Sequence, residues 1–267
     1  MNPAASLTTT GARAAPVVFL TGASTGIGEA LARHYAAQGA TLGLVARRGA
    51  LLDTVRACLP GRHFCYVADV RDADTLRAAA ETFIADAGLP DLVIANAGVS
   101  VGTLTGEQDD LPAFEAVFDI NVLGLVRTFA PFVKPMQARG AGTLVGVASV
   151  AGIRGLPGAG AYSASKSAAI SYLESLRVEL RGSGVQVKTL CPGYIDTPMT
   201  EKNPYPMPFM LDADDAAARF ARFFDSRRSY AVIPWQMGVV AKIMRLLPNP
   251  VYDALAVKSG RKPRGTL

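Results

Sequence analysis

A tyrosine and a lysine stand four residues apart, and this pair could move a proton. Tyr162 and Lys166 lie at the start of a segment with helical spacing, so their side chains share one face. A free phenol has a pKa of about 10, and a nearby ammonium stabilises the phenolate and lowers that value. Tyr162 could then protonate the alkoxide that forms when a carbonyl group accepts a hydride. Because such a pair also arises by chance, it needs supporting residues.

Two further polar residues could complete this site. Ser149 ends a predicted strand, and its hydroxyl could hydrogen-bond a carbonyl oxygen and stabilise developing charge. Asn121 stands among apolar residues of a predicted helix, where an amide needs hydrogen-bond partners. It could hold a water that links Lys166 to solvent, or it could be a structural amide that holds backbone.

A glycine-rich turn, Thr21-Gly22-Ala23-Ser24-Thr25-Gly26-Ile27-Gly28, follows the first predicted strand. Glycines let a pyrophosphate approach the backbone, and the helix that follows offers free N–H groups and the positive end of its dipole. The strand and helix around the turn favour a dinucleotide site over a tight turn without a ligand, and a P-loop lysine is absent. The predicted cofactor contacts here are Gly22, Ser24, Thr25, Gly26, Ile27 and Gly28.

Two arginines, Arg47 and Arg48, follow the second predicted strand. An NAD site usually places an acid there to bind the ribose 2′-hydroxyl, and that acid is absent. A guanidinium fork suits a 2′-phosphate instead. The sequence therefore predicts NADP(H), with Arg47 the first candidate and Arg48 the second. The alternative is a solvated pair in a loop.

Three later segments, each just beyond a predicted strand, could complete the cofactor site. The carboxylate of Asp69 could accept from an adenine amino group or could cap the next helix. The backbone of Ile195 and the hydroxyl of Thr197 could hold a nicotinamide carboxamide, or this segment could be a turn and helix cap. Lys166 could also reach the nicotinamide ribose. The predicted contacts are Asp69, Val70, Asn96, Ala97, Gly98, Pro192, Gly193, Ile195 and Thr197, with Tyr162 and Lys166.

Short apolar segments alternate with amphipathic ones along the chain, and this pattern must position these residues. The expected strands are 17–21, 41–46, 64–68, 92–95, 143–148, 186–190 and 230–233. The expected helices are 28–38, 50–58, 72–86, 111–136, 161–181 and 212–225. Continuous apolar strands between helices predict one α/β domain with a doubly wound parallel sheet. Ligands bind beyond the carboxyl ends of such strands, where every candidate above lies.

The sequence resembles a short-chain dehydrogenase/reductase over about residues 16–235. The matching motifs, in the family's order, are Thr21-Gly22-x3-Gly26-x-Gly28, Asp69, Asn96-Ala97-Gly98, Asn121, Ser149, Tyr162-x3-Lys166, and Pro192-Gly193 with Thr197. The resemblance implies a Rossmann fold of seven strands in the order 3-2-1-4-5-6-7 and a catalytic tetrad of Asn121, Ser149, Tyr162 and Lys166. It also implies that basic residues after the second strand mark an NADP-preferring member. Helices 111–136 and 161–181 would form a homodimer or homotetramer surface.

Composition excludes other classes of site. The chain has 50% hydrophobic and 18% charged residues, which indicates a globular protein. Most of its net charge of +5 comes from four cations near the end, Lys258, Arg261, Lys262 and Arg264, so we expect no nucleic-acid partner. Three cysteines without C-x-x-C spacing and two histidines predict neither disulfides nor a metal site, as in a cytoplasmic protein. No signal peptide or membrane span is expected.

The expected organisation is a flexible N-terminus (1–15), a Rossmann domain (16–235) and a C-terminal helical extension with a basic tail (236–267). The extension could pack on the body or a partner, lie weakly on a membrane surface, or cover the substrate as a flap. The tail itself is expected to be solvated and frayed, or weakly drawn to an anionic surface.

Apolar residues near the expected site predict a lipophilic ketone, aldehyde or secondary alcohol as substrate, although they could be mere lid packing. They are Ile153, Leu156, Tyr194, Tyr205, Met207, Phe209 and Met210. The rival functions are a non-catalytic NADP-binding sensor or regulatory protein, and a nucleotide-sugar epimerase or dehydratase. The intact tetrad argues against the sensor, and the chain has no room for a sugar domain.

Overall fold

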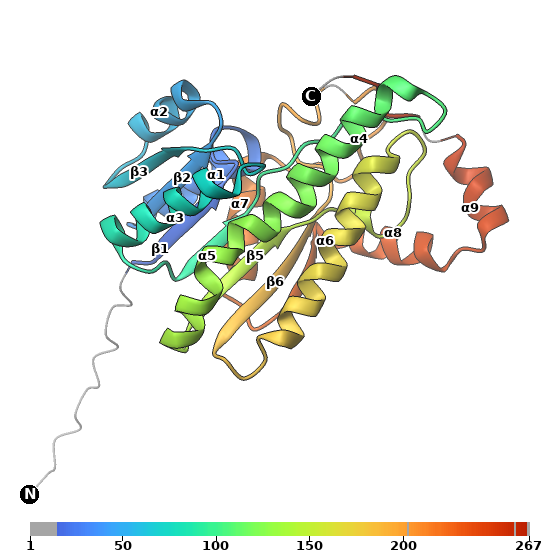
Figure 1. Ribbon diagram of the computed structural model, residues 1–267. Helices are drawn as coiled ribbons and strands as arrows, with labels where there is room; N and C mark the ends of the chain where they lie inside the picture. Colours follow the sequence, from blue (N-terminus) through green and yellow to red (C-terminus); the bar gives the residue numbers. More distant parts are fainter. Residues whose placement is uncertain (1–14, 202, 259, 266–267) are drawn as a thin grey trace, which may run out of the picture.

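Seven apolar segments pair into one parallel sheet in the order β3-β2-β1-β4-β5-β6-β7 (Figure 1). A computed structural model of the chain describes residues 15–201, 203–258 and 260–265. The expected flexible N-terminus therefore lies, apart from Ala15, outside the described residues. The strands are β1 (Val17–Thr21), β2 (Thr41–Ala46), β3 (His63–Val67), β4 (Leu92–Ala95), β5 (Gly142–Val147), β6 (Val185–Pro192) and β7 (Tyr230–Ile233). The predicted fold class and strand order are confirmed.

Helices cover both faces of the sheet. They are α1 (Gly26–Ala37), α2 (Gly49–Ala57), α3 (Ala73–Ala87), α4 (Leu111–Phe118), α5 (Gly124–Arg139), α6 (Gly160–Glu179), α7 (Ala213–Phe224), α8 (Trp235–Leu246) and α9 (Asn249–Ala256). One buried cluster joins the sheet to α1, α2 and α7. A second cluster joins the opposite face to α3, α5 and α6, which lie in front of the sheet in Figure 1. This two-sided burial explains why the strands are apolar throughout.

Alternation along β1 and β2 divides the core between the two faces. Leu20 and Leu44 face the α1–α7 side, whereas Phe19 and Val45 face the α3–α6 side. Gly43 allows Phe83 of α3 to lie directly on β2, because a Cβ at this glycine would come within 2.7 Å of the phenyl ring. Close helix packing of this kind fixes the positions of the loops at the carboxyl edge of the sheet.

The helix expected over residues 111–136 is wrong as a single element. It is two helices, α4 and α5, joined by a π-helical turn over Asp119–Leu123. The stretch Gln108–Arg139 has the length and mean hydropathy of a membrane span. The inner face of α5 is buried against the sheet and α3, however, as in the core helix of a globular protein.

The C-terminal helices pack beside the loop that joins β5 to α6. Helix α8 contacts β7 and the short 3₁₀ turn over Val150–Gly152. Arg154 in the same loop donates to the backbone oxygen of Leu247 at 2.8 Å and to the side-chain oxygen of Asn249 at 3.0 Å. Its guanidinium also lies 3.9 Å from the ring centroid of Tyr252 in α9. These contacts fasten the extension to the β5–α6 loop.

Residues 260–265 are mostly exposed, in agreement with the expected solvated tail, but the expectation that they are frayed is wrong. Gly102 N–H donates to the backbone oxygen of Pro263 at 3.0 Å, and Gly102 and Arg264 form a parallel β-bridge. Arg264 also makes a forked ion pair with the buried carboxylate of Asp110. Residues 266–267 lie outside the described part of the chain.

Candidate active site

A groove runs along the carboxyl edge of the sheet and collects residues from six loops. Its lining contains every predicted site residue except Gly28 and Asn121, which lie behind it. The lining residues that the sequence predicted are Gly22, Ser24, Thr25, Gly26, Ile27, Arg47, Arg48, Asp69, Val70, Asn96, Ala97, Gly98, Ser149, Tyr162, Lys166, Pro192, Gly193, Ile195 and Thr197. Motifs from six separate loops thus meet in one groove.

The glycine-rich turn forms the floor of the groove between β1 and α1. Gly22 and Gly26 have φ values of 69° and 58°, which favour glycine. A Cβ at Gly22 would come within 2.8 Å of the Ala97 backbone, and one at Gly26 would come within 3.1 Å of Thr197. Gly28 serves packing, because a Cβ added there would lie 2.0 Å from the carbonyl oxygen of Gly22. It lets α1 pack on the turn and does not face the groove.

Asn96 holds this turn from the neighbouring strand β4. Its side-chain nitrogen donates to the backbone oxygens of Thr21 at 3.1 Å and Gly22 at 3.2 Å. The hydroxyl of Thr21 in turn accepts from the backbone N–H groups of Asn96 and Ala97. Asn96 therefore shapes the cofactor turn through its side chain, in addition to lining the groove.

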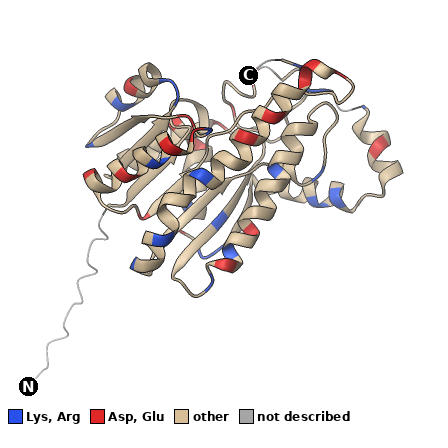
Figure 2. Ribbon diagram, viewed as in Figure 1, with Lys and Arg blue, Asp and Glu red and all other residues tan. Residues whose placement is uncertain are grey.

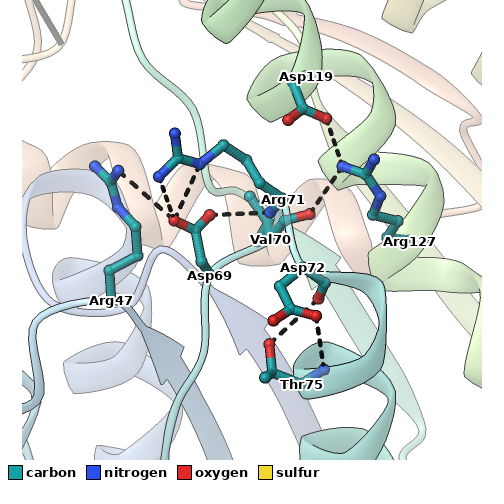
Figure 3. A network of polar contacts seen from close by, with 8 residues as sticks. All are labelled: Arg47, Asp69, Val70, Arg71, Asp72, Thr75, Asp119 and Arg127. Carbon is teal, nitrogen blue, oxygen red and sulfur yellow. Dashed lines mark hydrogen bonds and ion pairs between the residues drawn. The ribbon is translucent and has the colours of Figure 1, made fainter.

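Arginines gather at the β2–β3 end of the groove (Figure 3). Arg47 lies 3.9 Å from the Asp69 carboxylate, and Arg71 makes two hydrogen bonds to the same carboxylate group. Together these cations outweigh the ordinary desolvation cost and hold the pKa of Asp69 below its usual range. Arg48 reaches back to the hydroxyl of Thr25 at 3.5 Å. Both Arg47 and Arg48 are exposed, so their remaining N–H donors face solvent at the groove's edge.

The alternative role of Asp69 as a helix cap is excluded by its contacts. Asp72 caps α3, because its carboxylate accepts from the backbone N–H groups of Asp74 and Thr75. Figure 3 shows Asp69 turned away from this cap and toward Arg47 and Arg71. Sequence reasoning missed Arg71, and its only signal was its place two residues after Asp69.

Lys166 is buried in α6, close to Tyr162 but directed past it. Its ammonium donates to the backbone oxygen of Val147 at 2.8 Å and lies 5.9 Å from the centroid of the Tyr162 ring. Burial lowers the pKa of Lys166 to about 8. Burial also raises the pKa of the Tyr162 phenol, while a hydrogen bond with Ser149 acts in the opposite direction.

The expectation that the ammonium lowers the phenol's pKa is therefore wrong in this state. Desolvation disfavours both charged forms, and the lysine's hydrogen bond goes to the backbone of β5 and not to the phenol oxygen. The phenol keeps its proton, so the side chain that can act here is a proton donor.

Asn121 lies in the π-helical turn, and its amide joins three segments. It accepts from Val99 N–H at 2.9 Å and donates to the oxygen of Val99 at 3.0 Å and to the Ser165 hydroxyl at 3.0 Å. The structural role that the sequence left open is thus present. A Cβ at Gly98 would meet both the Asn121 side-chain oxygen at 3.2 Å and the Lys166 ammonium at 3.4 Å. Asn121 and Lys166 therefore both approach Gly98, which lines the groove.

The segment after β6 crosses the groove opposite the glycine-rich turn. Thr200 was not predicted, yet its hydroxyl donates to the backbone oxygen of Ile195 at 2.6 Å and accepts from Thr197 N–H at 3.1 Å. Pro198 and Met199 also line the groove. No repeating pattern in the sequence marks these contacts, because they arise within one irregular loop.

The expected substrate side contains aromatic residues and one unexpected cation. The rings of Tyr194 and Tyr205 have centroids 6.5 Å apart, whereas Phe209 and Met210 are largely exposed. The ammonium of Lys262 lies 5.7 Å from the centroid of the Tyr162 ring. The sequence predicted little fixed charge around the substrate. This prediction is incomplete, because it assigned Lys262 to a solvated tail and not to the surroundings of Tyr162.

Comparison with known proteins agrees with this geometry. The family model "short chain dehydrogenase" matches residues 16–206. The chain is 38% identical over 241 residues to an uncharacterized oxidoreductase of Myxococcus xanthus, covering 89% of this chain and 95% of the relative.

Solved structures show the same similarity. A short-chain dehydrogenase from Streptomyces avermitilis superposes with a TM-score of 0.78 at 26% identity, covering 91% of this chain and 96% of that one. A 3-ketoacyl-(acyl-carrier-protein) reductase from Brucella melitensis complexed with NADH gives 0.74 at 25% identity, covering 82% and 96%. With its seven parallel strands, its glycine-rich groove and the match over most of its length, the chain belongs to the short-chain dehydrogenase family, whose members are oxidoreductases that use NAD(H) or NADP(H).

Proposed function

We propose that the protein interconverts lipophilic ketones or aldehydes and the corresponding alcohols with NADP(H). The observation that carries this proposal is the meeting of Tyr162, Ser149 and Lys166 at one end of a groove whose other end carries Arg47 and Arg48. A proton donor and a dinucleotide-shaped groove in one cleft suit hydride transfer coupled to proton transfer.

The groove residues fit a dinucleotide cofactor. Gly22 and Gly26 leave space that a Cβ would fill, and α1 begins directly behind them with free N–H groups. Arg47 and Arg48 would hold the 2′-phosphate, while Ile195 and Thr197 would hold the carboxamide. When bound, NADPH supplies a hydride to the carbonyl carbon. The choice of NADP(H) over NAD(H) rests on the two arginines alone, since the Brucella melitensis relative binds NADH.

The side chains of the cleft supply the proton and hold the substrate oxygen. Tyr162 carries a proton and would donate it to the oxygen that becomes the alcohol. Ser149 would hydrogen-bond the same oxygen and orient it. Lys166, with a pKa of about 8, is mostly charged at neutral pH and would hold the ribose hydroxyls. Asn121 would complete the tetrad by fixing the backbone at Val99 and a water beside Lys166.

The substrate class rests on apolar residues that lie beyond the lining of the dinucleotide groove, among which Tyr205 is close enough to Tyr162 to interact electrostatically with it. Tyr194 and Tyr205 present aromatic surface, and Ile153 and Leu156 lie in the loop before α6. These residues favour a substrate with a large apolar body over a small polar one.

Assembly and location complete the proposal. We place a homodimer or homotetramer contact on α5 and α6, the helices that this family commonly uses. We also propose a cytoplasmic protein whose α8–α9 extension touches membrane surfaces weakly. Helix α8 supports this contact through its exposed residues Trp235, Ile243 and Leu246 and its lack of acidic residues (Figure 2).

The decisive experiment measures NADPH consumption with a panel of lipophilic ketones and aldehydes, using wild-type protein and Tyr162→Phe. We expect Tyr162→Phe to lose roughly 10²- to 10⁴-fold in turnover, because it removes the proton donor and leaves the groove intact. NADPH binding, followed by its fluorescence, should change far less than turnover, because the other groove contacts remain. NADPH binding without turnover of any carbonyl in the wild type would favour the sensor and overturn the enzyme.

A further inference from the structure

The end of the described chain, residues 260–265, forms a short strap outside the groove lining that brings Lys262 near the Tyr162 end of the cleft. It lies beside residues 102–103, which in turn pair with residues 158–159 ahead of α6. A Cβ at Gly102 would lie 2.3 Å from the backbone oxygen of Lys262, so the strap rests directly on this glycine. A Cβ at Gly260 would likewise come within 3.0 Å of Tyr205. The strap thus contacts both the 102–103 segment and Tyr205.

A forked ion pair fixes the strap in register. The guanidinium of Arg264 contacts the two carboxylate oxygens of Asp110 at 2.9 Å and 3.1 Å. Asp110 is buried and also accepts from the backbone N–H of Leu104 at 2.8 Å. A planar contact through two hydrogen bonds fixes the orientation of the Arg264 guanidinium as well as its distance from the Asp110 carboxylate. The residues next to Arg264, Lys262 among them, are therefore held in a fixed position near Tyr162.

Lys262 is the strap residue that faces the catalytic tyrosine. Its ammonium lies 5.7 Å from the Tyr162 ring centroid, and the Lys166 ammonium lies 5.9 Å from the same centroid. Within the described residues, no carboxylate forms an ion pair with Lys262, and burial alone lowers its pKa. A partly desolvated cation without an anionic partner, beside a reacting group, is suited to bind an anion from the substrate.

We propose that Lys262 recognises a carboxylate carried by the carbonyl substrate close to its reacting carbon. The substrate would then be an amphipathic oxo acid, with its apolar body against Tyr194 and Tyr205 and its carboxylate at the strap. This inference rests on the proposed function, because it requires that Tyr162 bind a carbonyl oxygen. Lys262 is assigned to specificity and takes no part in the proton transfer.

The test compares one substrate with and without its charge. The probes are 2-oxo-4-phenylbutanoate and its ethyl ester, which share the apolar body and the reacting carbonyl. We expect Lys262→Met to lower kcat/KM for the acid about 10- to 100-fold, mainly through KM, and to change the ester about twofold or less. Lys262→Arg should retain most of the wild-type preference for the acid. Arg261→Met, which removes a neighbouring exposed cation of the same strap, should change neither substrate.

The results that would refute the carboxylate site at Lys262 differ from those that would refute the proposed reductase function. An equal loss for acid and ester in Lys262→Met, or no loss for the acid, would refute the carboxylate site while leaving the reductase in place. Turnover of the ester with refusal of the acid by the wild type would do the same. If no carbonyl in the panel consumed NADPH, the proposed function would fall and this inference with it. Thermal unfolding of each variant shows that the fold is kept.

Discussion

At the scale of single residues, the cleft holds two groups whose protonation is set mainly by burial. Tyr162 keeps its proton because desolvation disfavours the phenolate, and Lys166 loses its proton more easily than a free lysine. Sequence reasoning identified both residues from type and spacing but gave the wrong direction for the phenol. Spacing within a helix does not reveal that the Lys166 ammonium bonds to Val147 on a neighbouring strand.

The lowered pKa of Lys166 predicts a pH dependence for reduction. The ammonium exists below pH about 8 and is lost as the pH rises through that value, so its hydrogen bonds to the cofactor are lost in the same direction. We expect kcat/KM for NADPH, which reports the free enzyme, to be level near neutrality and to fall above pH about 8. Tyr162, whose pKa is raised, does not cause this fall. A profile that rose through this range would contradict the assignment.

Arg47 predicts the cofactor preference. Replacing Arg47 with Ala removes a guanidinium that can bind the 2′-phosphate, which NADH lacks. We expect kcat/KM to fall about 10- to 100-fold for NADPH and to change little for NADH. Arg62→Ala, a substitution of an exposed arginine ahead of β3, is the matched control. Equal losses with both cofactors would remove the basis for NADP(H).

At the scale of elements, the sequence placed all seven strands within two residues, because fully apolar segments bounded by polar turns are distinctive. It missed the π-helical turn at 119–123, since the apolar periodicity continues from α4 into α5. The strap at 260–265 was also missed. Its position depends on Asp110 and Gly102, which lie more than a hundred residues earlier, and no local pattern encodes such a contact.

The π-helical turn predicts a structural cost when Asn121 is removed. Asn121→Ala leaves the backbone N–H and oxygen of Val99 without their amide partner. We expect the free energy of unfolding to fall by about 1–3 kcal/mol, measured by urea denaturation. Ser165→Ala should cost less, because it removes the Asn121–Ser165 hydrogen bond and the bond from the Ser165 hydroxyl to the Tyr162 backbone oxygen but leaves both Val99 contacts in place. Wild-type stability combined with lost activity would assign Asn121 to chemistry alone.

At the scale of the whole molecule, a single sheet brings distant motifs to one edge. Parallel strands end together, so loops from residues 22 to 200 meet in one groove although no two of its motifs adjoin. Figure 2 shows acidic and basic residues interspersed along most of the ribbon, whereas α5 and α8 carry only basic ones. The net charge of the chain therefore indicates little about its binding partners, and the positions of individual charged residues indicate more.

The exposed face of α8 predicts a weak membrane contact. Trp235, Val239, Ile243 and Leu246 recur at helical spacing and are exposed, beside the basic residues Lys242 and Arg245. We expect a fraction of the protein to float with anionic vesicles and to be released by salt.

The double variant Ile243→Glu, Leu246→Glu should lose most of that binding. Leu51→Glu, on α2, should retain it, because Leu51 is exposed at a distance from α8 along the chain. If the double variant floated like the wild type, or if the wild type did not float at all, the membrane contact would be refuted. The exposed face of α8 would then be assigned to a contact with another protein surface.

The glycine under the strap gives a way to sort other members of the family. Any side chain at the position of Gly102 would displace the backbone at Lys262, since a Cβ there would lie 2.3 Å from its oxygen. A chain with a bulkier residue at this point cannot seat its terminus in the same way, whatever the terminus contains. Genomes can therefore be screened with two positions, a glycine here and a lysine two residues before the arginine that pairs with Asp110. Chains that carry both are the ones to assay first on oxo acids.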